Sequence, residues 1–156
     1  TNLIQNAGER KVVLFSHHQP FSLFEGQGEK LVSKISKLLD GNKIFAWYWG
    51  HEHRCALYEK HPIWNFYGRC IGHSGFPYFR DDFKDSKFDN SPGWINFSGK
   101  NLIPGCSVLD GSNLYIKDHE IEYGPNGYVV LEFNDRILRE IIMNADGSIL
   151  KSQELT

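Results

Sequence analysis

Short runs of consecutive apolar residues, separated by turn residues, dominate the first half of the chain. One run extends from Ile44 to Trp49, Ile-Phe-Ala-Trp-Tyr-Trp, and ends at Gly50. A continuous apolar run between turn residues predicts a strand that is buried on both faces. A second run, Lys11 to Ser16, is rich in β-branched residues and is followed by two histidines and Pro20. The proline predicts a turn, so we interpret this run as a second buried strand.

The segment between the two runs, from Gly28 to Leu39, has a helical period. Its apolar residues form one stripe, and lysines and serines lie on the other side; the stripe comprises Leu31, Val32, Ile35, Leu38 and Leu39. The residues Asp40-Gly41-Asn42 predict the end of this helix. Strand, helix and strand in this order indicate a βαβ unit, so the two strands should be parallel neighbours in one sheet.

The pattern is irregular in the middle of the chain and regular again at its end. We expect short strands within 54–58 and 64–71, a long irregular segment from Gly72 to about Pro125, and three antiparallel strands at Gly127–Phe133, Arg136–Met143 and Ser148–Leu155. No internal repeat or linker interrupts the sequence. These features predict a single domain, residues 1–156, of the α/β (mixed α+β) class, with a mixed sheet and a C-terminal antiparallel meander.

Composition narrows the classes of function. The 156 residues are 40% hydrophobic and 23% charged, as in ordinary globular proteins, and the net charge of −2 gives no footprint for nucleic acid or an anionic membrane. No apolar stretch approaches the ~20 residues that a membrane helix needs. The three cysteines are too few for a disulfide framework, so we expect thiols in a reducing compartment and predict a cytoplasmic protein.

Histidines follow both predicted strands. Because parallel strands end at the same edge of a sheet, His17 should meet the pair His51 and His53, which are two residues apart and share one side of an extended backbone. Three protein ligands with an open position are typical of a catalytic metal. His18 should point away from His17 and contact substrate, and His73 is either a second substrate contact or an ordinary loop histidine.

Two further histidines, His61 and His119, lie outside any such motif, and we interpret them as ordinary structural residues.

Two motifs resemble a known family. Val12 to Pro20, Val-Val-Leu-Phe-Ser-His-His-Gln-Pro, followed by Gly50-His51-Glu52-His53, resembles the last two signature motifs of the calcineurin-like metallophosphoesterases. Gly72 to Tyr78 and Gly127 to Phe133 also resemble downstream segments of bacterial members, so the resemblance covers essentially the whole chain. It implies a β-sandwich flanked by helices that hydrolyses phosphoesters with two metal ions, such as Mn, Fe or Zn.

The resemblance also assigns ligands. It implies that His17 and His51 bind one metal ion and that His53 binds the other. The first half of that family supplies Asp-x-His, Gly-Asp-x-x-Asp and Gly-Asn-His motifs, and none of these occurs in this sequence. The chain therefore resembles the C-terminal half of a metallophosphoesterase and carries an incomplete site.

Half of a sandwich leaves apolar sheet surface uncovered. We therefore expect the chain to associate with itself or with the missing N-terminal half, in addition to binding a phosphoester substrate. Two alternatives stay open. The chain is either a non-catalytic metal-binding or interaction domain that keeps the fold without the carboxylates, or a single-zinc hydrolase in which Glu52 is the general base.

Overall fold

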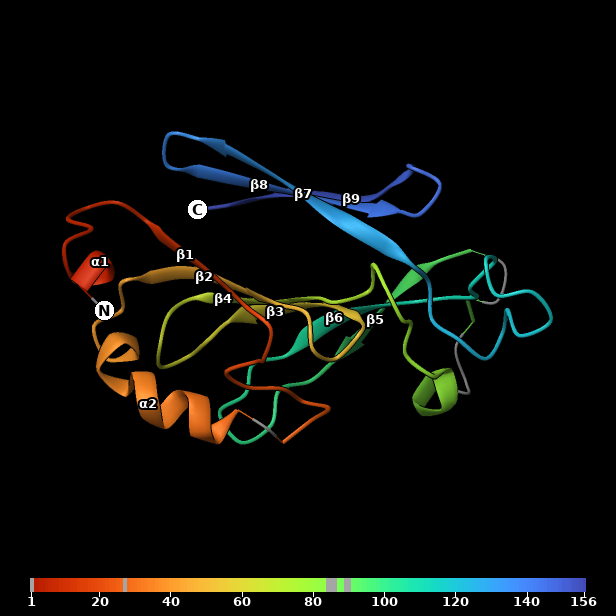
Figure 1. Cartoon of the computed structure of the whole chain (residues 1–156), viewed down its shortest axis with the longest axis horizontal. Helices are drawn as coiled ribbons and strands as arrows, with labels where there is room; N and C mark the ends of the chain where they lie inside the picture. Colours follow the sequence, from red (N-terminus) through yellow and green to blue (C-terminus); the bar gives the residue numbers. More distant parts are fainter. Residues whose placement is uncertain (1, 27, 84–86, 89–90) are drawn as a thin grey trace. The chain divides into compact units, whose positions relative to one another are not determined.

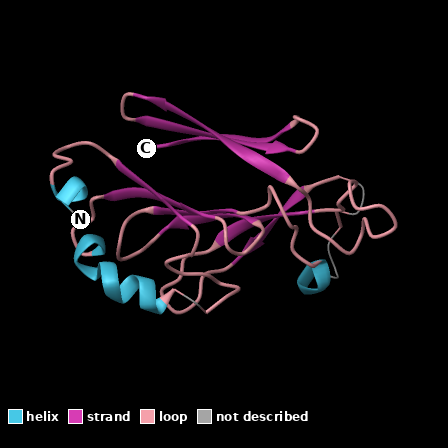
Figure 2. Ribbon diagram, in the orientation of Figure 1, coloured by secondary structure: helices cyan, strands magenta, loops and turns pink. Residues whose placement is uncertain are grey.

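The computed structural model of the chain describes residues 2–26, 28–83, 87–88 and 91–156. Within them the protein is mixed α+β, and its regular elements are mostly strands (Figure 2). It forms two compact units. Unit 1 comprises 1–52, 56–70 and 96–107, and unit 2 comprises 53–55, 71–95 and 108–156. No helix in the described ranges has the length and apolarity needed to cross a membrane.

The larger sheet contains the predicted βαβ unit. Its six strands have the order β1 (Val12–Ser16), β2 (Ile44–Trp49), β4 (Tyr67–Ile71), β3 (Cys55–Lys60), β6 (Cys106–Asp110) and β5 (Gly93–Phe97). Strand β1 pairs with β2 in parallel, and β2 pairs with β4 in parallel. Helix α2 (Glu29–Leu39) connects β1 to β2 and lies to one side of them, as Figure 1 shows. The predicted parallel pair is confirmed.

Residues at both ends of helix α2 explain where the helix begins and ends. A Cβ atom on Gly28 would lie 2.2 Å from the carbonyl oxygen of Pro20, so the helix can begin this close to the preceding loop only with glycine. At the other end the Asp40 N–H donates to the Ser36 carbonyl. Leu39, the last apolar residue of the stripe, is buried. A shorter helix, α1 (Asn2–Gln5), precedes β1.

The two strands of the βαβ unit differ in burial. Trp47, Tyr48 and Trp49 of β2 are at most 3% exposed, as predicted for a central strand. The prediction that β1 is equally buried is wrong, because β1 is the first strand in the order and has one neighbour. None of its residues is fully buried, and Phe15 is 61% exposed.

The core of unit 1 is aromatic. Phe21 contacts the rings of Trp49, Tyr58 and Phe66 at centroid distances of 5.2–5.8 Å. A Cβ atom on Gly68 would lie 2.6 Å from the Phe21 ring, so β4 must carry glycine at this position. Aromatic residues make up 14% of the chain, and packing in this core explains several of them.

The segment 72–125 is more regular than predicted. It contains β5, β6 and a 3₁₀ helix, η1 (Arg80–Phe83). The short runs Trp-Ile-Asn-Phe in β5 and Cys-Ser-Val-Leu in β6 carry the strand pattern, but the turn residues around them obscured it. The prediction of one long irregular excursion is therefore wrong.

The C-terminal meander is confirmed. Strands β7 (Gly127–Asn134), β8 (Ile137–Asn144) and β9 (Ile149–Leu155) form an antiparallel three-stranded sheet. Asp135 adopts φ 51° in the first turn, and Gly147 adopts φ 85° in the second. Both residue types tolerate the left-handed region, which explains why these turns were readable from the sequence.

Candidate metal centre

The ends of β1 and β2 bring two histidines together. The register places Ser16 opposite Trp49, so the residues that follow each strand are neighbours. The backbone N–H groups of Gly50 and His51 both donate to the His17 carbonyl, at 3.2 and 2.9 Å. The two loops are thus hydrogen-bonded to each other at the histidines themselves.

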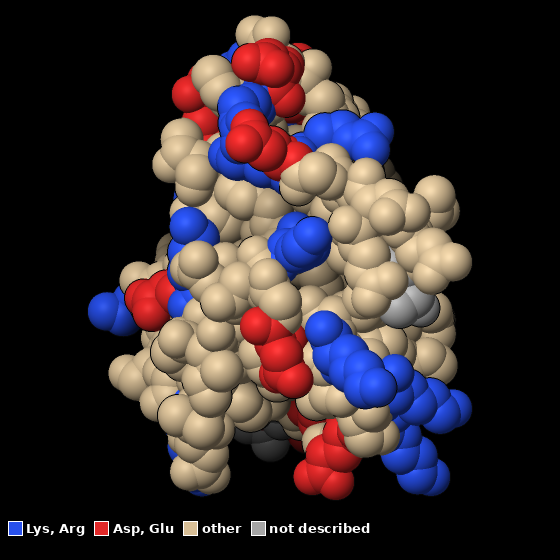
Figure 3. All heavy atoms as spheres, turned by 90° about the vertical axis from the view of Figure 1, so that its left-hand side faces the viewer, with Lys and Arg blue, Asp and Glu red and all other residues tan. Residues whose placement is uncertain are grey.

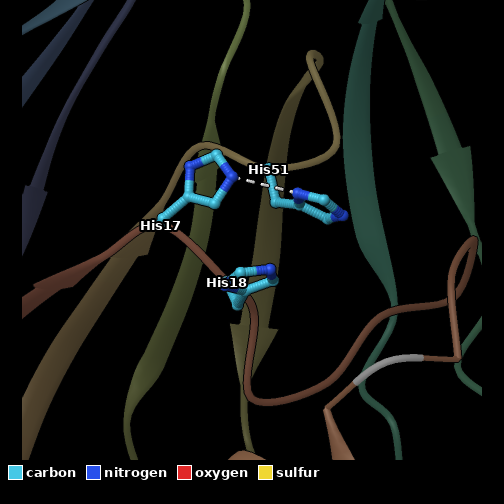
Figure 4. Close-up of side chains that lie close together, drawn as sticks. All are labelled: His17, His18 and His51. Atoms are coloured by element: carbon cyan, nitrogen blue, oxygen red, sulfur yellow. Dashed lines mark hydrogen bonds between the residues drawn. The ribbon is translucent and has the colours of Figure 1, made fainter.

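Three imidazoles converge at this point. His17, His18 and His51 each offer a ring nitrogen, and these nitrogens all lie within 4.8 Å of one another. The closest pair is Nε2 of His17 and Nδ1 of His51, 3.1 Å apart, marked by the dashed line in Figure 4. His17 and His18 are exposed and His51 is half-buried, so a solute can reach the group. Among the described residues this is the one group of three metal-binding side chains.

The orientation of the His18 side chain differs from the one predicted from the sequence. Strand alternation would turn it away from His17, but β1 ends at Ser16 and the chain bends over the next two residues. The ring of His18 therefore faces His51, with centroids 4.6 Å apart. The predicted orientation is wrong, because the period of two holds only while the backbone stays extended.

Hydrogen bonds fix this bend. The Ser16 hydroxyl donates to the His18 carbonyl at 2.7 Å, and it accepts a hydrogen bond from Trp47 Nε1, also at 2.7 Å. Trp47 is buried in β2. The position of His18 is thus tied to the central strand through one hydroxyl group.

The buried side chain of Glu52 connects the loop after β1 to the end of β2. Its carboxylate is 3% exposed and accepts hydrogen bonds from the Ser22 hydroxyl and from Trp49 Nε1, the latter at 3.0 Å. Ser22 lies in the loop after His18, and Trp49 ends β2. Burial, with the nearby Glu52 charge as the next cause, raises the pKa of Tyr58, which lies 3.4 Å from the Ser22 hydroxyl. Glu52 is therefore a buried anchor, which argues against the alternative that made it a general base.

A second carboxylate, that of Glu25, lies near His51. Glu25 Oε2 lies 3.6 Å from Nε2 of His51, the ring nitrogen that does not face His17. Both side chains are partly exposed, at 34% and 26%. Glu25 was not predicted as a site residue, since no motif marks an acidic residue in the loop before α2.

His53 belongs to unit 2 and has a different local structure from the one predicted. Residues 51–54 form a turn, and His53 adopts φ 52°, so the extended backbone assumed for the His51–His53 pair is absent. The exposed His53 ring lies 5.9 Å from the ring of Phe76 in the same unit. The described cluster consists of His17, His18 and His51, without His53.

His73, also in unit 2, is an interior residue. It is 1% exposed, and its carbonyl accepts hydrogen bonds from the Gly127 N–H and from the Asn126 amide. Burial lowers the pKa of its imidazole to about 4, an effect that the backbone of Ile71 partly offsets. This burial favours a packing role over the substrate contact.

The remaining two histidines, His61 and His119, lie outside the described cluster. Nδ1 of His61 accepts hydrogen bonds from the N–H groups of Ile63 and Trp64, both at 3.2 Å, and burial lowers the His61 pKa to about 4. His119 pairs with Glu122 at 3.1 Å on the surface.

The donor set suits a transition metal. Imidazole nitrogens with one nearby carboxylate are a donor set that could hold one ion of Zn, Fe or Mn. The face in Figure 3 carries acidic and basic side chains side by side, in keeping with the small net charge.

No protein-family model matches the chain, and no curated protein matches its sequence.

Proposed function

We propose that this chain is part of a metal-dependent phosphoester hydrolase and supplies the histidine ligands of its metal centre. The observation that carries the proposal is the 3.1 Å approach of His17 and His51 at the ends of two parallel strands. The resemblance to the metallophosphoesterases assigns these two histidines to one metal ion. A bound metal ion of this kind supplies positive charge that stabilises the phosphoryl group during hydrolysis.

The chain's own residues hold and orient the centre. His17 and His51 bind the metal ion, and Glu52 holds their loops. His17 and His18 are exposed, so a phosphoester can reach the cluster. The proposal assigns His53 to a second ion. The sequence contains none of the family's carboxylate motifs, so a further polypeptide segment provides the missing ligands.

Exposed apolar residues support an association with such a segment or with a second copy. Phe15 lies on the edge strand β1. In the other sheet Tyr128 and Val130 of β7 are 43% and 38% exposed, and alternate residues of one strand share a face. Such apolar surface favours a partner. Light scattering at high protein concentration tests this association. A chain that stays monomeric alone, and also when mixed with the candidate segments, contradicts it.

A cytoplasmic location stays part of the proposal. The burial of all three cysteines agrees with thiols in a reducing compartment.

The test is turnover by the protein expressed from its complete coding sequence. Nitrophenyl phosphate and bis-nitrophenyl phosphate serve as monoester and diester probes, with added Mn²⁺. We expect His51→Ala to reduce kcat by at least about 100-fold, since it removes a metal ligand. His119→Ala is the matched control, because His119 is a surface histidine outside the cluster, and it should leave kcat unchanged. Turnover that survives His51→Ala, or no turnover of either probe, overturns the proposal.

A further inference from the structure

The spacing of the three imidazoles matches the ligand spacing of a single small ion. Two nitrogens bound tetrahedrally at about 2.0–2.1 Å from zinc lie about 3.3 Å apart. Nε2 of His17 and Nδ1 of His51 are already 3.1 Å apart. One ring nitrogen from each of the three histidines lies within 4.8 Å of the other two. His17 and His18 are exposed, so a rotation of their side chains closes the remaining gap without disturbing the core.

The two nitrogens of His51 face different kinds of group. Nδ1 points at His17, and Nε2 points at the Glu25 carboxylate, 3.6 Å away. A metal-binding imidazole usually directs its other nitrogen at a carboxylate or carbonyl, which fixes the tautomer and makes the ligand more basic. The Glu25 carboxylate beside Nε2 of His51 has the place of such a partner, which fits a cation on the Nδ1 side of the ring.

Hydrogen bonds hold the backbone of the three histidines in place before any ion binds. The His51 N–H bonds to the His17 carbonyl, and the Ser16 hydroxyl holds the His18 carbonyl. Because these contacts fix the three Cα positions, an ion has only side-chain rotations to order. That lowers the entropic cost of binding.

We infer that His17, His18 and His51 together bind one divalent transition-metal ion of the zinc class, with Glu25 orienting His51. The inference rests on the metal centre of the proposed function and deepens it. It makes His18 a ligand, whereas the family resemblance assigns ligand roles to His17, His51 and His53. Three imidazoles leave the fourth position of a tetrahedral ion open to solvent or substrate.

Binding of Zn²⁺ to the 156-residue chain, followed by isothermal titration calorimetry near neutral pH, tests the inference. We expect one ion per chain. His18→Ala should weaken the affinity by at least about 100-fold, because loss of a ligand costs no less than loss of a supporting partner. Glu25→Gln should weaken it by about tenfold. His119→Ala should bind like the wild type, because His119 lies outside the cluster. Circular dichroism of each variant confirms that the fold is intact.

Substitution of Co²⁺ gives a readout of geometry. A three-histidine site should give the visible spectrum of a four-coordinate ion, and His18→Ala should lose it. Wild-type affinity in His18→Ala overturns the inference. So does a wild-type chain that binds no zinc.

The titration and the turnover assay fail separately. Zinc bound through His18 in a protein that hydrolyses neither probe keeps the inference and removes the proposed function. If turnover requires His51 but the zinc affinity does not change in His18→Ala, the proposed function is kept and the inference is removed.

Discussion

Two polar clusters in this protein are built in opposite ways. In unit 2, Asp110 is fully buried, accepts two hydrogen bonds from Arg80 at 3.0 and 3.1 Å, and accepts a third from the Tyr78 hydroxyl at 2.6 Å. In unit 1, His17 and His18 are exposed and converge with His51. Nε2 of His17 lies 3.1 Å from Nδ1 of His51, and the centroids of the His18 and His51 rings are 4.6 Å apart.

The difference separates a structural cluster from a candidate binding site. A buried charge is tolerated only when its partners satisfy it, so the Asp110 cluster is complete in itself. Exposed imidazoles have no such requirement, and their convergence does not stabilise the chain by burial. Their arrangement makes sense for a ligand that comes from outside.

The largest effect should come from breaking the buried cluster. Arg80→Met leaves the Asp110 carboxylate without its bidentate cation, and loss of one partner of a buried pair costs about 3–5 kcal/mol. Urea unfolding measures the free energy of unfolding. Arg139→Met is the control, because Arg139 pairs with Glu132 at 3.3 Å with both side chains about half exposed. We expect a change within about 0.5 kcal/mol there. Equal effects in the two variants would contradict the structural role of the Asp110 cluster.

Acid should destabilise the protein through the two buried histidines. Burial lowers the pKa of both His61 and His73 to about 4, below the ordinary value of 6.5. Between these values the unfolded chain binds more protons, so the stability is complete above pH 6.5 and is lost as the pH falls towards 4. Between pH 7 and pH 5 the free energy of unfolding should fall by about 2 kcal/mol per histidine.

Unfolding curves at a series of pH values measure the effect. His73→Leu should make the dependence shallower, because it removes one of the two imidazoles and leaves a side chain of similar size. A dependence that His73→Leu does not alter would show that His73 titrates normally in the folded protein.

Much of the fold was readable from the sequence, because local patterns specify it. The apolar run of β2, the stripe of α2 and the turns at Asp135 and Gly147 each determine one element. The βαβ order then places His17 beside His51. The edge position of β1 was not readable, because apolar content is the same for edge and central strands. Strand β5 was hidden by the turn residues around it.

The residues that form the site could be predicted only in part, because local sequence patterns specify only some of them. The convergence of His17 and His51 follows from strand topology, whereas the place of His18 depends on a bend held by the Ser16 hydroxyl. That hydrogen bond joins a side chain to a carbonyl two residues away, and no hydrophobic pattern reports it. Glu25 likewise comes to His51 from a loop whose path the sequence does not specify.

A change of intermediate size should follow from weakening the buried support of the histidine cluster. Glu52→Gln keeps the shape of the side chain but replaces one acceptor oxygen with a donor, which then faces the Ser22 hydroxyl or Trp49 Nε1. We expect a loss of about 1–3 kcal/mol in urea unfolding and a roughly tenfold weaker zinc affinity. Glu59→Gln, at an exposed position of β3, should change neither. If Glu52→Gln lowered stability alone, Glu52 would support the fold without positioning the histidines.

The smallest change in stability should come from the cluster itself. His17→Ala removes an exposed ring, so without added metal its free energy of unfolding should stay within about 0.5 kcal/mol of the wild type. Zinc at 100 times its Kd should stabilise the wild-type chain by about 2.7 kcal/mol, because it binds only the folded state, and should stabilise His17→Ala much less. Thermal unfolding with and without zinc gives both numbers. A loss above 2 kcal/mol in His17→Ala without zinc would mean that the imidazoles hold the loops together, and the contrast with the Asp110 cluster would disappear.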